Sequence, residues 1–577
     1  MNCSKVFFFL SFISTGFASS AQVFPVKNYP KGYFQWPVDA TVGLAANFGE
    51  LRPNHYHMGL DCRTDQVQNK RVFAAADGYI AKVKIEPSGF GRCIYINHPN
   101  GLTTVYAHLN EFMPALEKYV TEQQYKLQSW KIFIDIPANL FPVKKGQVIA
   151  YSGSTGGSEG PHTHFEIRDT KTDKVLNTLL FGFPITDNIP PSVLRLAVYD
   201  RSISVYEQTP KIYPLRKVNG VFMPPASLLI EHTDKVSFAI TAFDRYIGST
   251  HENGIYQAVL YDNEKPVVGF DIDSISYDQT RDVNAHIDYK LKNSGGPYVQ
   301  HLSKLSGYNE SIYKEISGDG VIDISNDSTH QIKIAVMDAY GNTSYVKFDV
   351  RSNIPYKPKT AADSIEDPNE FLPGCINVFE NNNISFYLPE ASLYDSIRFK
   401  YNVLKPNSSY DVSDIFELQN GTIPIHGYFP IKIKGNVSDT FKDKIVMERY
   451  WGNKKDFAKA DDQNGWYKAA FKEFGYFKLL LDTIPPIIKP IGFRDGMNCA
   501  GIRRLAFVIS DNCSDESKDI INFRAELDGN WLRFTNDKNL AYIYNFDDHC
   551  ARGPHELKIS AEDLAGNKTE KIYHFTR

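Results

Sequence analysis

Residues 160–168 read Gly-Pro-His-Thr-His-Phe-Glu-Ile-Arg, and this stretch decides how the amino-terminal part of the chain is interpreted. Along residues 163–167 polar and apolar side chains alternate, which is typical of a strand with one face in a core. His162 and His164 therefore share a face with Glu166. Two imidazoles at positions i and i+2 of a strand can converge on one centre. Either both bind a metal, or one binds it and the other contacts a water beside it.

Further histidines, and an aspartate that could bind a metal, occur earlier in the chain. Residues 57–61 read His-Met-Gly-Leu-Asp. Residues four apart on a straight strand are about 13 Å apart, whereas zinc–ligand bonds are about 2 Å long. His57 and Asp61 can share an ion only if the chain bends between them, and Gly59 is the residue that would permit a bulge or turn. His108 ends another alternating run, which could carry its ring onto the same centre.

Two imidazoles and one carboxylate are the ligand types of a zinc site with an open coordination position. His57, Asp61 and His164 make up such a set within one domain. An ion held in this way lowers the pKa of a water from 15.7 towards about 7 and polarises a carbonyl group. The sequence therefore predicts zinc as the cofactor and hydrolysis as the reaction.

The first domain is predicted at residues 22–186, with its core at 45–170. Short alternating segments separated by Gly and Pro turns predict an antiparallel β-sheet. An insertion at residues 112–142 interrupts this pattern. Within it, residues 114–130 have apolar side chains near helical spacing and predict an amphipathic helix. The helix either adds packing to the sheet or forms a wall that restricts access to the site.

Two short motifs recur in the same order farther along the chain. Asp-Asn-Ile-Pro-Pro at residues 187–191 returns as Asp-Thr-Ile-Pro-Pro at 482–486, and Asp-Ala-Tyr-Gly-Asn at 338–342 returns as Asp-Leu-Ala-Gly-Asn at 563–567. Paired prolines suit a linker or the first edge strand of a domain. The repeat therefore predicts one type of β-sandwich that occurs twice.

Three β-sandwich domains are predicted in the remainder of the chain. The two copies of the repeat occupy residues 187–351, with insertions, and residues 482–577; residues 352–481 between them show similar strands. Short alternating strands with frequent turns indicate immunoglobulin-like sandwiches, although the Cys-Trp-Cys spacing of antibody domains is absent. The predicted fold class is mainly β, with an antiparallel β-sheet core that carries a helical insertion, followed by about three immunoglobulin-like domains.

The amino terminus has the pattern of a signal peptide at residues 1–21. An apolar run at residues 6–12 is followed by small residues, and cleavage is expected after Ala21. A membrane anchor would need about 20 apolar residues, and Ser11 and Gly16 interrupt the run too early. We therefore expect an exported protein, in the periplasm, in the cell envelope or secreted, with no membrane insertion after cleavage.

The composition argues against nucleic acid as a partner and indicates a folded chain of several domains. The 63 Lys and Arg residues nearly balance 67 Asp and Glu residues, and a net charge of −4 provides no broad electrostatic field for nucleic acid. The length of 577 residues exceeds the roughly 250 to 300 that a single core supports. Aromatic residues at 13 % favour strands over helices.

Six cysteines remain after the predicted signal peptide, and an exported compartment permits disulfides. Proximity along the chain favours Cys62 with Cys93, and one pair among Cys499, Cys513 and Cys550. Buried free thiols are the alternative.

The motifs of residues 48–168 together carry a family resemblance. In order they are Phe-Gly at 48–49, His-x-x-x-Asp at 57–61, Ala-Ala-Ala-Asp-Gly at 74–78, Tyr-Ala-His-Leu at 106–109, Lys-Gly-Gln at 145–147 and Gly-Pro-His-Thr-His-Phe-Glu at 160–166. This stretch resembles the lysostaphin and LytM type of zinc metalloendopeptidase, which cleaves peptide bonds in bacterial peptidoglycan. The resemblance implies His57, Asp61 and His164 as zinc ligands and His108 and His162 as the catalytic pair, without deciding which acts as acid and which as base.

By this resemblance the chain is an exported zinc metalloendopeptidase that hydrolyses cross-links or stem peptides of peptidoglycan through metal-activated water. The immunoglobulin-like domains would position it on the wall or on a protein partner. The alternative is a non-catalytic LytM-type scaffold or regulator of another cell-wall hydrolase, although relatives of that kind typically lose ligands and none is missing here. The insertion at residues 112–142 departs from the family pattern and leaves substrate specificity open.

Overall fold

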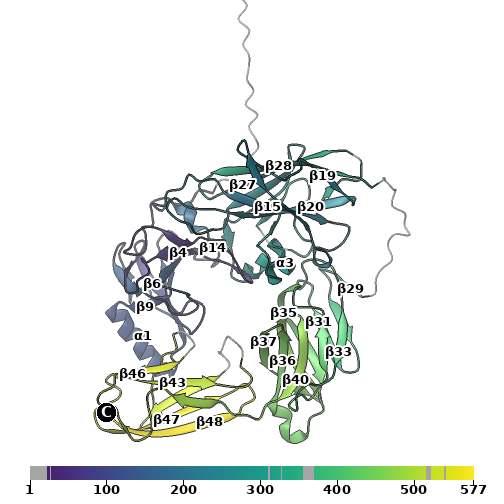
Figure 1. The fold of residues 1–577 in the computed structure, drawn as a ribbon. Coiled ribbons are helices and arrows are strands. Elements are labelled where there is room, and N and C mark those ends of the chain that lie inside the picture. Colours follow the sequence, from purple (N-terminus) through teal and green to yellow (C-terminus); the bar gives the residue numbers. More distant parts are fainter. Residues whose placement is uncertain are drawn as a thin grey trace, which may run out of the picture.

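The computed structural model describes residues 23–25, 27–308, 312–326, 328–354, 369–514, 521–537 and 541–577. The predicted signal peptide at residues 1–21 lies outside these ranges. Within the described ranges no helix has both the length and the apolar character needed to cross a bilayer. The chain is mostly β, as predicted, and consists of a peptidase-like domain followed by β-sandwich domains (Figure 1).

An antiparallel sheet forms the centre of the first domain. Its main strands run in the spatial order β1 (Leu44–Ala46), β4 (Leu60–Arg63), β13 (His162–Asp169), β8 (Leu102–Ala107), β7 (Arg92–Asn97), β6 (Gly78–Ile85) and β10 (Ile132–Asp135). A smaller sheet of β5 (Arg71–Phe73), β12 (Val148–Ser152) and β9 (Leu109–Phe112) packs with it through a shared apolar core. In the register of β4 and β13, Asp61 lies opposite His164. Strand pairing alone therefore brings two predicted site residues together.

The predicted helix is α1 (Pro114–Leu127). Pro114 occupies the first turn, where its missing N–H is tolerated, and Lys126 lies in the last turn, where a cation is favourable. Leu116, Val120 and Gln124, spaced four residues apart, form its buried face. The helix ends three residues earlier than predicted, because Gln128 adopts a left-handed conformation that caps it.

The second domain is a two-sheet sandwich that continues from the first. One sheet contains β16 (Lys211–Pro214), β15 (Ser192–Asp200), β20 (Lys235–Phe243) and β24 (Gln300–His301). The other contains β18 (Val221–Met223), β28 (Thr343–Ser352), β27 (His330–Met337), β21 (Gln257–Asp262) and β22 (Lys265–Asp271). Strand β14 (Val175–Leu176) pairs with both β13 and β23 (Ser274–Ile275), so the site sheet is hydrogen-bonded to this domain.

The third domain is a sandwich of two five-stranded sheets. Their strands are β30 (Asn377–Glu380), β31 (Ile384–Leu388), β35 (Pro424–Lys434), β39 (Trp466–Glu473) and β38 (Asp461–Gln463), and β33 (Tyr401–Leu404), β34 (Ile415–Leu418), β40 (Gly475–Leu481), β36 (Ile445–Trp451) and β37 (Lys454–Lys459). A single apolar core runs through the second and third domains. These two domains therefore pack as one body.

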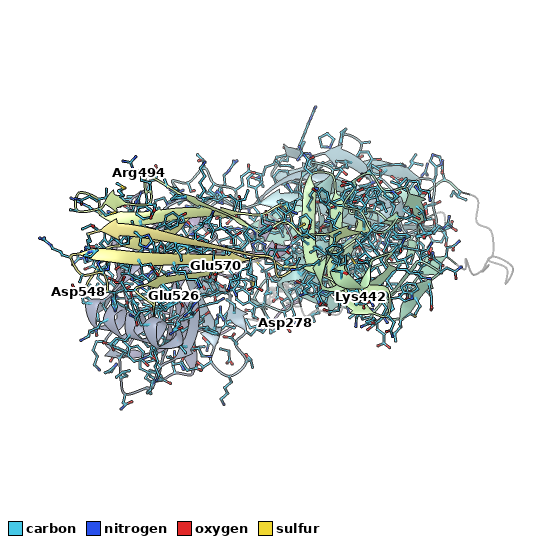
Figure 2. All side chains as sticks on the ribbon, turned by 90° about the horizontal axis from the view of Figure 1, so that it is seen from below. Asp278, Lys442, Arg494, Glu526, Asp548 and Glu570 are labelled. Carbon is cyan, nitrogen blue, oxygen red and sulfur yellow. The ribbon has the colours of Figure 1, made fainter. Side chains whose placement is uncertain are left out.

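The carboxyl-terminal domain is a smaller sandwich with its own core. Its sheets are β41 (Ile487–Pro490), β43 (Arg504–Ser510) and β46 (Tyr542–Asn545), and β42 (Met497–Asn498), β48 (Lys568–Thr576), β47 (Pro554–Glu562), β44 (Asn522–Leu527) and β45 (Asn530–Trp531). Figure 1 shows the four domains arranged in a ring, in which this last domain returns to α1. Figure 2, seen from below, likewise shows its strands beside that helix.

Aromatic and polar contacts close the ring. The ring of Tyr125 in α1 stacks on that of His549, with centroids 3.8 Å apart and planes inclined by 9°. Tyr125 also meets Trp531 edge-on, with centroids 5.2 Å apart. Next to this contact, Nη1 of Arg533 donates to Oε1 of Gln124 at 3.1 Å. One side of α1 thus packs on the sheet, and the other holds the carboxyl-terminal domain.

The cysteine pairing that we expected is wrong, because all six described cysteines are free thiols. Cys62 lies on β4 and Cys93 on β7, and two strands, β13 and β8, separate them in the sheet. With about 4.8 Å between neighbouring strands, these residues are far beyond the roughly 7 Å between Cα atoms that a disulfide spans.

Candidate metal centre

Three of the five predicted site residues converge through one atom each. Nε2 of His57 lies 2.9 Å from Oδ1 of Asp61 and 3.0 Å from Nδ1 of His164. The third side of this triangle, from Nδ1 of His164 to Oδ1 of Asp61, is 2.9 Å. All three side chains are buried. The structure thus brings together the imidazoles and the carboxylate that the spacing indicated.

The bend between His57 and Asp61 lies directly before β4, which begins at Leu60. Gly59 is needed there for a different reason from the one we expected. Its backbone is not in the left-handed region, but an added Cβ would lie 2.6 Å from the carbonyl oxygen of Phe165 and 2.9 Å from the ring of His164. Glycine is therefore required by close approach to the neighbouring strand.

Hydrogen bonds fix which nitrogen of each ligand ring faces the centre. Nδ1 of His57 donates to the backbone carbonyl of Asn47 at 2.7 Å. Nε2 of His164 donates to Oε1 of Glu166 at 2.9 Å. Because an oxygen at each of these positions can only accept, the opposite nitrogen of each neutral ring carries a lone pair towards the centre. This is the arrangement that supporting groups impose on metal-binding histidines.

The three converging atoms fit a small cation. Two imidazole lone pairs and one carboxylate oxygen about 3 Å apart repel one another unless a positive charge lies between them. Zinc bonds of 2.0 to 2.1 Å in tetrahedral geometry place ligand atoms roughly 3.3 Å apart. Burial lowers the pKa of His164, yet the carboxylates of Asp61 and Glu166 outweigh it and raise that pKa to about 9, so the negative charge around this ring favours a cation, which is a proton in the metal-free site and a metal ion in the loaded one. The donor set and its charge therefore suit Zn²⁺.

The other two predicted residues, His108 and His162, lie beside this triangle with ring centroids 4.8 Å apart. Nδ1 of His162 donates to the carbonyl oxygen of Gly160 at 2.9 Å. Nε2 of His162 lies 3.4 Å from Oδ1 of Asp61. Nδ1 of His108 donates to the carbonyl oxygen of Thr155 at 2.8 Å. Each ring thus leaves Nε2 free to exchange a proton in the site.

His108 adopts an unusual backbone conformation at the end of β8. Its φ of 59° lies in the left-handed region, which residues with a Cβ seldom adopt. This conformation turns the side chain out of the alternation of the strand and towards His162. Burial, followed by the nearby His162 and His164, lowers the pKa of His108 to about 3. The ring is therefore neutral near neutral pH.

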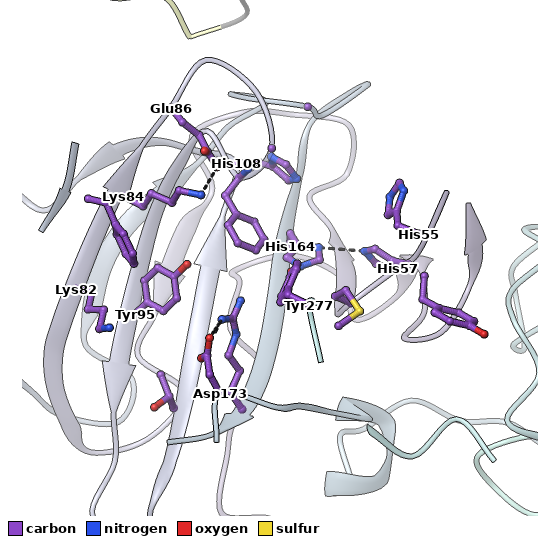
Figure 3. A pocket seen from close by; sticks show the side chains of 18 of the residues that line it. His55, His57, Lys82, Lys84, Glu86, Tyr95, His108, His164, Asp173 and Tyr277 are labelled. Atoms are coloured by element: carbon purple, nitrogen blue, oxygen red, sulfur yellow. Dashed lines mark hydrogen bonds and ion pairs between the residues drawn. The ribbon is translucent and has the colours of Figure 1, made fainter. Parts of the chain in front are cut away.

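A pocket of about 890 Å³ opens over the centre (Figure 3). His57, His108 and His164 line its base. Among the other lining residues are Phe90, Tyr95, Phe133 and Tyr277, with basic side chains at Lys82 and Lys84. No residue of α1 lines the pocket, so of the two alternatives the helix adds packing to the sheet and does not form a wall. Phe133, from the same insertion, does line the pocket.

Several supporting residues were not identified from the sequence. Glu166 was placed on the histidine face but given no role; it is fully buried and accepts hydrogen bonds from His164, Arg168 and the hydroxyl of Tyr277. Tyr277 comes from the second domain, and no local sequence signal connects it to the site. Nη2 of Arg52 donates to Oδ2 of Asp61 at 2.9 Å. The alternating pattern around Glu166 is the one signal that could have revealed any of them.

Comparisons with known protein families match two parts of the chain. Residues 55–125 match the model of Peptidase family M23. Separately, residues 374–482, in the third domain, match the model of a Zu5-like domain.

Two curated bacterial proteins are similar to the chain. An uncharacterized metalloprotease of Haemophilus influenzae is 30% identical over 167 residues, which cover 27% of this chain and 29% of that protein. The DD-carboxypeptidase/endopeptidase Mpg of Neisseria meningitidis is 31% identical over 153 residues, which cover 26% of each. The matches thus span less than a third of the length of either relative. Among solved structures, a zinc containing peptidase from Vibrio cholerae is 26% identical over 24% of this chain and 37% of that chain, with a TM-score of 0.18.

Proposed function

We propose that the chain, whose residues 55–125 match the model of Peptidase family M23, is an exported zinc metalloendopeptidase that hydrolyses peptide bonds in bacterial peptidoglycan. The bonds would be cross-links or stem peptides. The observation that carries this proposal is the triangle of His57, Asp61 and His164 with His108 and His162 beside it. None of the five residues is replaced, which favours an enzyme over a non-catalytic scaffold.

In this proposal Nε2 of His57, Oδ1 of Asp61 and Nδ1 of His164 hold the zinc ion. Bound zinc supplies a Lewis acid that activates water and polarises the scissile carbonyl. Asn47 and Glu166 hold the two ligand rings in the tautomers that this requires. Arg52 takes the second oxygen of Asp61, so that the carboxylate presents Oδ1 to the ion.

His108 and His162 perform the proton transfers. Each has Nδ1 bound to a backbone carbonyl and Nε2 directed into the site. A neutral ring accepts the proton of the attacking water, and a protonated ring donates to the leaving amine or to the oxyanion. The carbonyls of Thr155 and Gly160 keep both rings in position for this exchange.

The substrate class rests on similarity and on the expected compartment. The Neisseria relative is named a DD-carboxypeptidase/endopeptidase, which supports a peptide of the cell wall as substrate. The signal-like sequence at residues 1–21 supports delivery to that compartment. The aromatic lining of the pocket, including Phe90, Phe133 and Tyr277, offers apolar surface to a peptide.

The test uses mature protein with insoluble peptidoglycan. We expect new free amino groups to appear, to stop appearing after treatment with a chelator, and to return when zinc is restored. Peptidoglycans of several cross-link types should be included, because the bond is not specified. Absence of new amino groups from all of them, with zinc loading verified by elemental analysis, would overturn the proposal in favour of a scaffold.

A further inference from the structure

Two clusters of three aspartates occur at equivalent places in the second and the carboxyl-terminal domains. They are Asp187, Asp244 and Asp338, and Asp482, Asp511 and Asp563. In each cluster the first aspartate begins the repeated motif that ends in Pro-Pro, and the second directly follows a strand, β20 or β43. The third lies in the turn between the last two strands of its domain, β27 and β28 or β47 and β48. The repeat thus carries the same cluster twice.

The first cluster contains buried carboxylate oxygens without a partner. Asp244 is 1% exposed, and neither of its carboxylate oxygens has a hydrogen-bond partner among the described residues. Oδ2 of Asp187 and Oδ1 of Asn253 are also buried and unpartnered. Arg245, the next residue along the chain, pairs with Glu252 instead. Removing a carboxylate from water without a compensating partner is strongly unfavourable, so this site requires either a protonated carboxyl group or a partner of opposite charge.

The second cluster also contains buried carboxylate oxygens without a hydrogen-bond partner among the described residues. Asp482 is 1% exposed and its Oδ2 is unpartnered, as is Oδ1 of Asp511. Nζ of Lys444 lies nearby but donates to the backbone carbonyl of Ala565 at 3.0 Å. Across the part of the chain that the structure describes, no lysine or arginine forms an ion pair with any aspartate of either cluster. Both clusters therefore lack a positive charge from the protein.

The chemistry of the clusters points to one class of ion. All donors are oxygens, which suit Ca²⁺, Mg²⁺ or Mn²⁺ rather than zinc. One oxygen from each aspartate lies within 4.8 Å of the others, which is close enough for one ion, and calcium accepts six to eight oxygens at 2.3 to 2.6 Å in flexible geometry. Magnesium bonds are shorter, about 2.1 Å, and strictly octahedral. We propose that each cluster binds one calcium ion.

The clusters lie where domains meet. The backbone N–H and C=O of Asp244 pair with those of Asn253, and the next residue, Gly254, exchanges hydrogen bonds with the side chain of Asn47 in the first domain. Asn47 also accepts the hydrogen bond from His57. Calcium at the first cluster would therefore stiffen the loop that supports a residue of the metal centre.

At the other junction, the backbone N–H of Asp482 donates to the carbonyl of Lys444 in the third domain at 2.9 Å. The side chain of Asn567 donates to the backbone carbonyl of Asp482 and to Oδ2 of Asp563. Calcium at the second cluster would fix the angle between the third and carboxyl-terminal domains. Neither site depends on the peptidase proposal, since neither includes a residue of the zinc centre.

Titration calorimetry of CaCl₂ into full-length, chelator-treated and zinc-reloaded protein tests the proposal. We expect two equivalents of calcium in the wild type, one in Asp244→Asn, one in Asp511→Asn and none in the double variant. Asp439→Asn, which removes an exposed carboxylate paired with Lys442 on the third domain (Figure 2), should retain two. Lack of binding at about 1 mM, the weak end for extracellular calcium sites, would overturn the proposal. Stoichiometry unchanged by the variants, or equal binding of MgCl₂, would also overturn it.

Thermal unfolding separates loss of binding from loss of fold. The wild type should show a higher Tm in calcium than in its absence, because an ion that binds only the folded state stabilises it. Asp244→Asn replaces a buried, unpartnered carboxylate with a neutral side chain of the same shape, so its Tm without calcium should not fall below that of the wild type. Its calcium-dependent increase should be smaller. A wild-type Tm that does not respond to calcium would contradict the proposal.

Discussion

In the proposed metal centre, each of the two ligand histidines is oriented by one hydrogen-bond acceptor behind it. The carbonyl of Asn47 holds His57, and the carboxylate of Glu166 holds His164. In both cases the acceptor takes the only proton of the neutral ring and leaves a lone pair facing Asp61. The ligand residues alone would not define the site without these two acceptors.

Replacement of the histidines should separate zinc binding from catalysis. His164→Ala removes a ligand, so we expect loss of both zinc and activity. His108→Ala leaves the three ligand atoms in place, so zinc should remain while activity falls by about 10² to 10⁴, the contribution of a general acid or base. Zinc content by elemental analysis and release of amino groups measure the two effects. His574→Ala, at a side chain that is 65% exposed, is the matched control. Zinc loss in His108→Ala would contradict these assignments.

Glu166→Gln tests the acceptor behind His164. Glutamine keeps the shape but removes the negative charge that faces His164 and Arg168. We expect zinc affinity to fall by roughly 10- to 100-fold, as for other residues that orient a metal ligand. Competition with a zinc-binding dye measures the affinity, and circular dichroism verifies the fold. An unchanged affinity would show that Glu166 serves packing alone.

At the scale of single residues, the sequence could predict the ligand types of the candidate metal centre but not all of its geometry. The ligand types of His57, Asp61 and His164, together with the family resemblance, indicated one centre, and their atoms do converge. The positive φ of His108 has no such signal, because the residue is not glycine and the strain is stored by surrounding structure. Tyr277 was missed because only the folded chain brings the second domain to Glu166.

At the scale of secondary structure, α1 connects the sheet of the first domain to the carboxyl-terminal domain. The apolar spacing of residues 114–130 predicted the helix, but its end was misplaced. Gln128 ends the helix without the glycine or proline that usually gives a sequence signal. The predicted pairing of Cys62 with Cys93 was wrong for a related reason, since distance along the chain does not give the order of strands in a sheet.

The buried face of α1 should be needed for stability. Leu116 is fully buried in the core of the first domain. Leu116→Ala should therefore lower the free energy of unfolding by about 2 to 5 kcal/mol, through lost apolar contact and the cavity left behind. Lys118→Ala, on the same helix with its side chain 80% exposed, should change it by less than about 0.5 kcal/mol. Urea denaturation measures both, and equal effects would contradict the packing described for α1.

At the scale of the whole molecule, the ring links the last domain to the first, which carries the candidate metal centre. Besides the contacts of α1, the backbone N–H of Gly156 donates to the carbonyl of Asp537 at 2.8 Å. Gly156 directly follows Thr155, whose carbonyl positions His108. The repeated motifs predicted that the second and last domains are similar, but they carry no information about this long-range contact.

Removing the contacts between α1 and the carboxyl-terminal domain should open the ring of four domains. Tyr125→Ala combined with Arg533→Ala removes the aromatic stack and the hydrogen bond to Gln124. Together these contribute roughly 1 to 3 kcal/mol. Small-angle scattering should show a larger radius of gyration for this variant, because the last domain is then held mainly through the third. The pair Lys118→Ala and Glu122→Ala, exposed on the same helix, should leave the scattering unchanged. An unchanged radius in the first variant would show that other contacts suffice to close the ring.

The most direct test of the central claim is mass spectrometry of fragments released from defined peptidoglycan by the wild type and by His162→Ala. The account predicts fragments in which one peptide bond has gained one water, formed by the zinc-loaded wild type and lost in the variant although its zinc content is unchanged. Fragments cut in the glycan strand, or peptide fragments that His162→Ala releases equally well, would contradict a zinc endopeptidase built on these five residues.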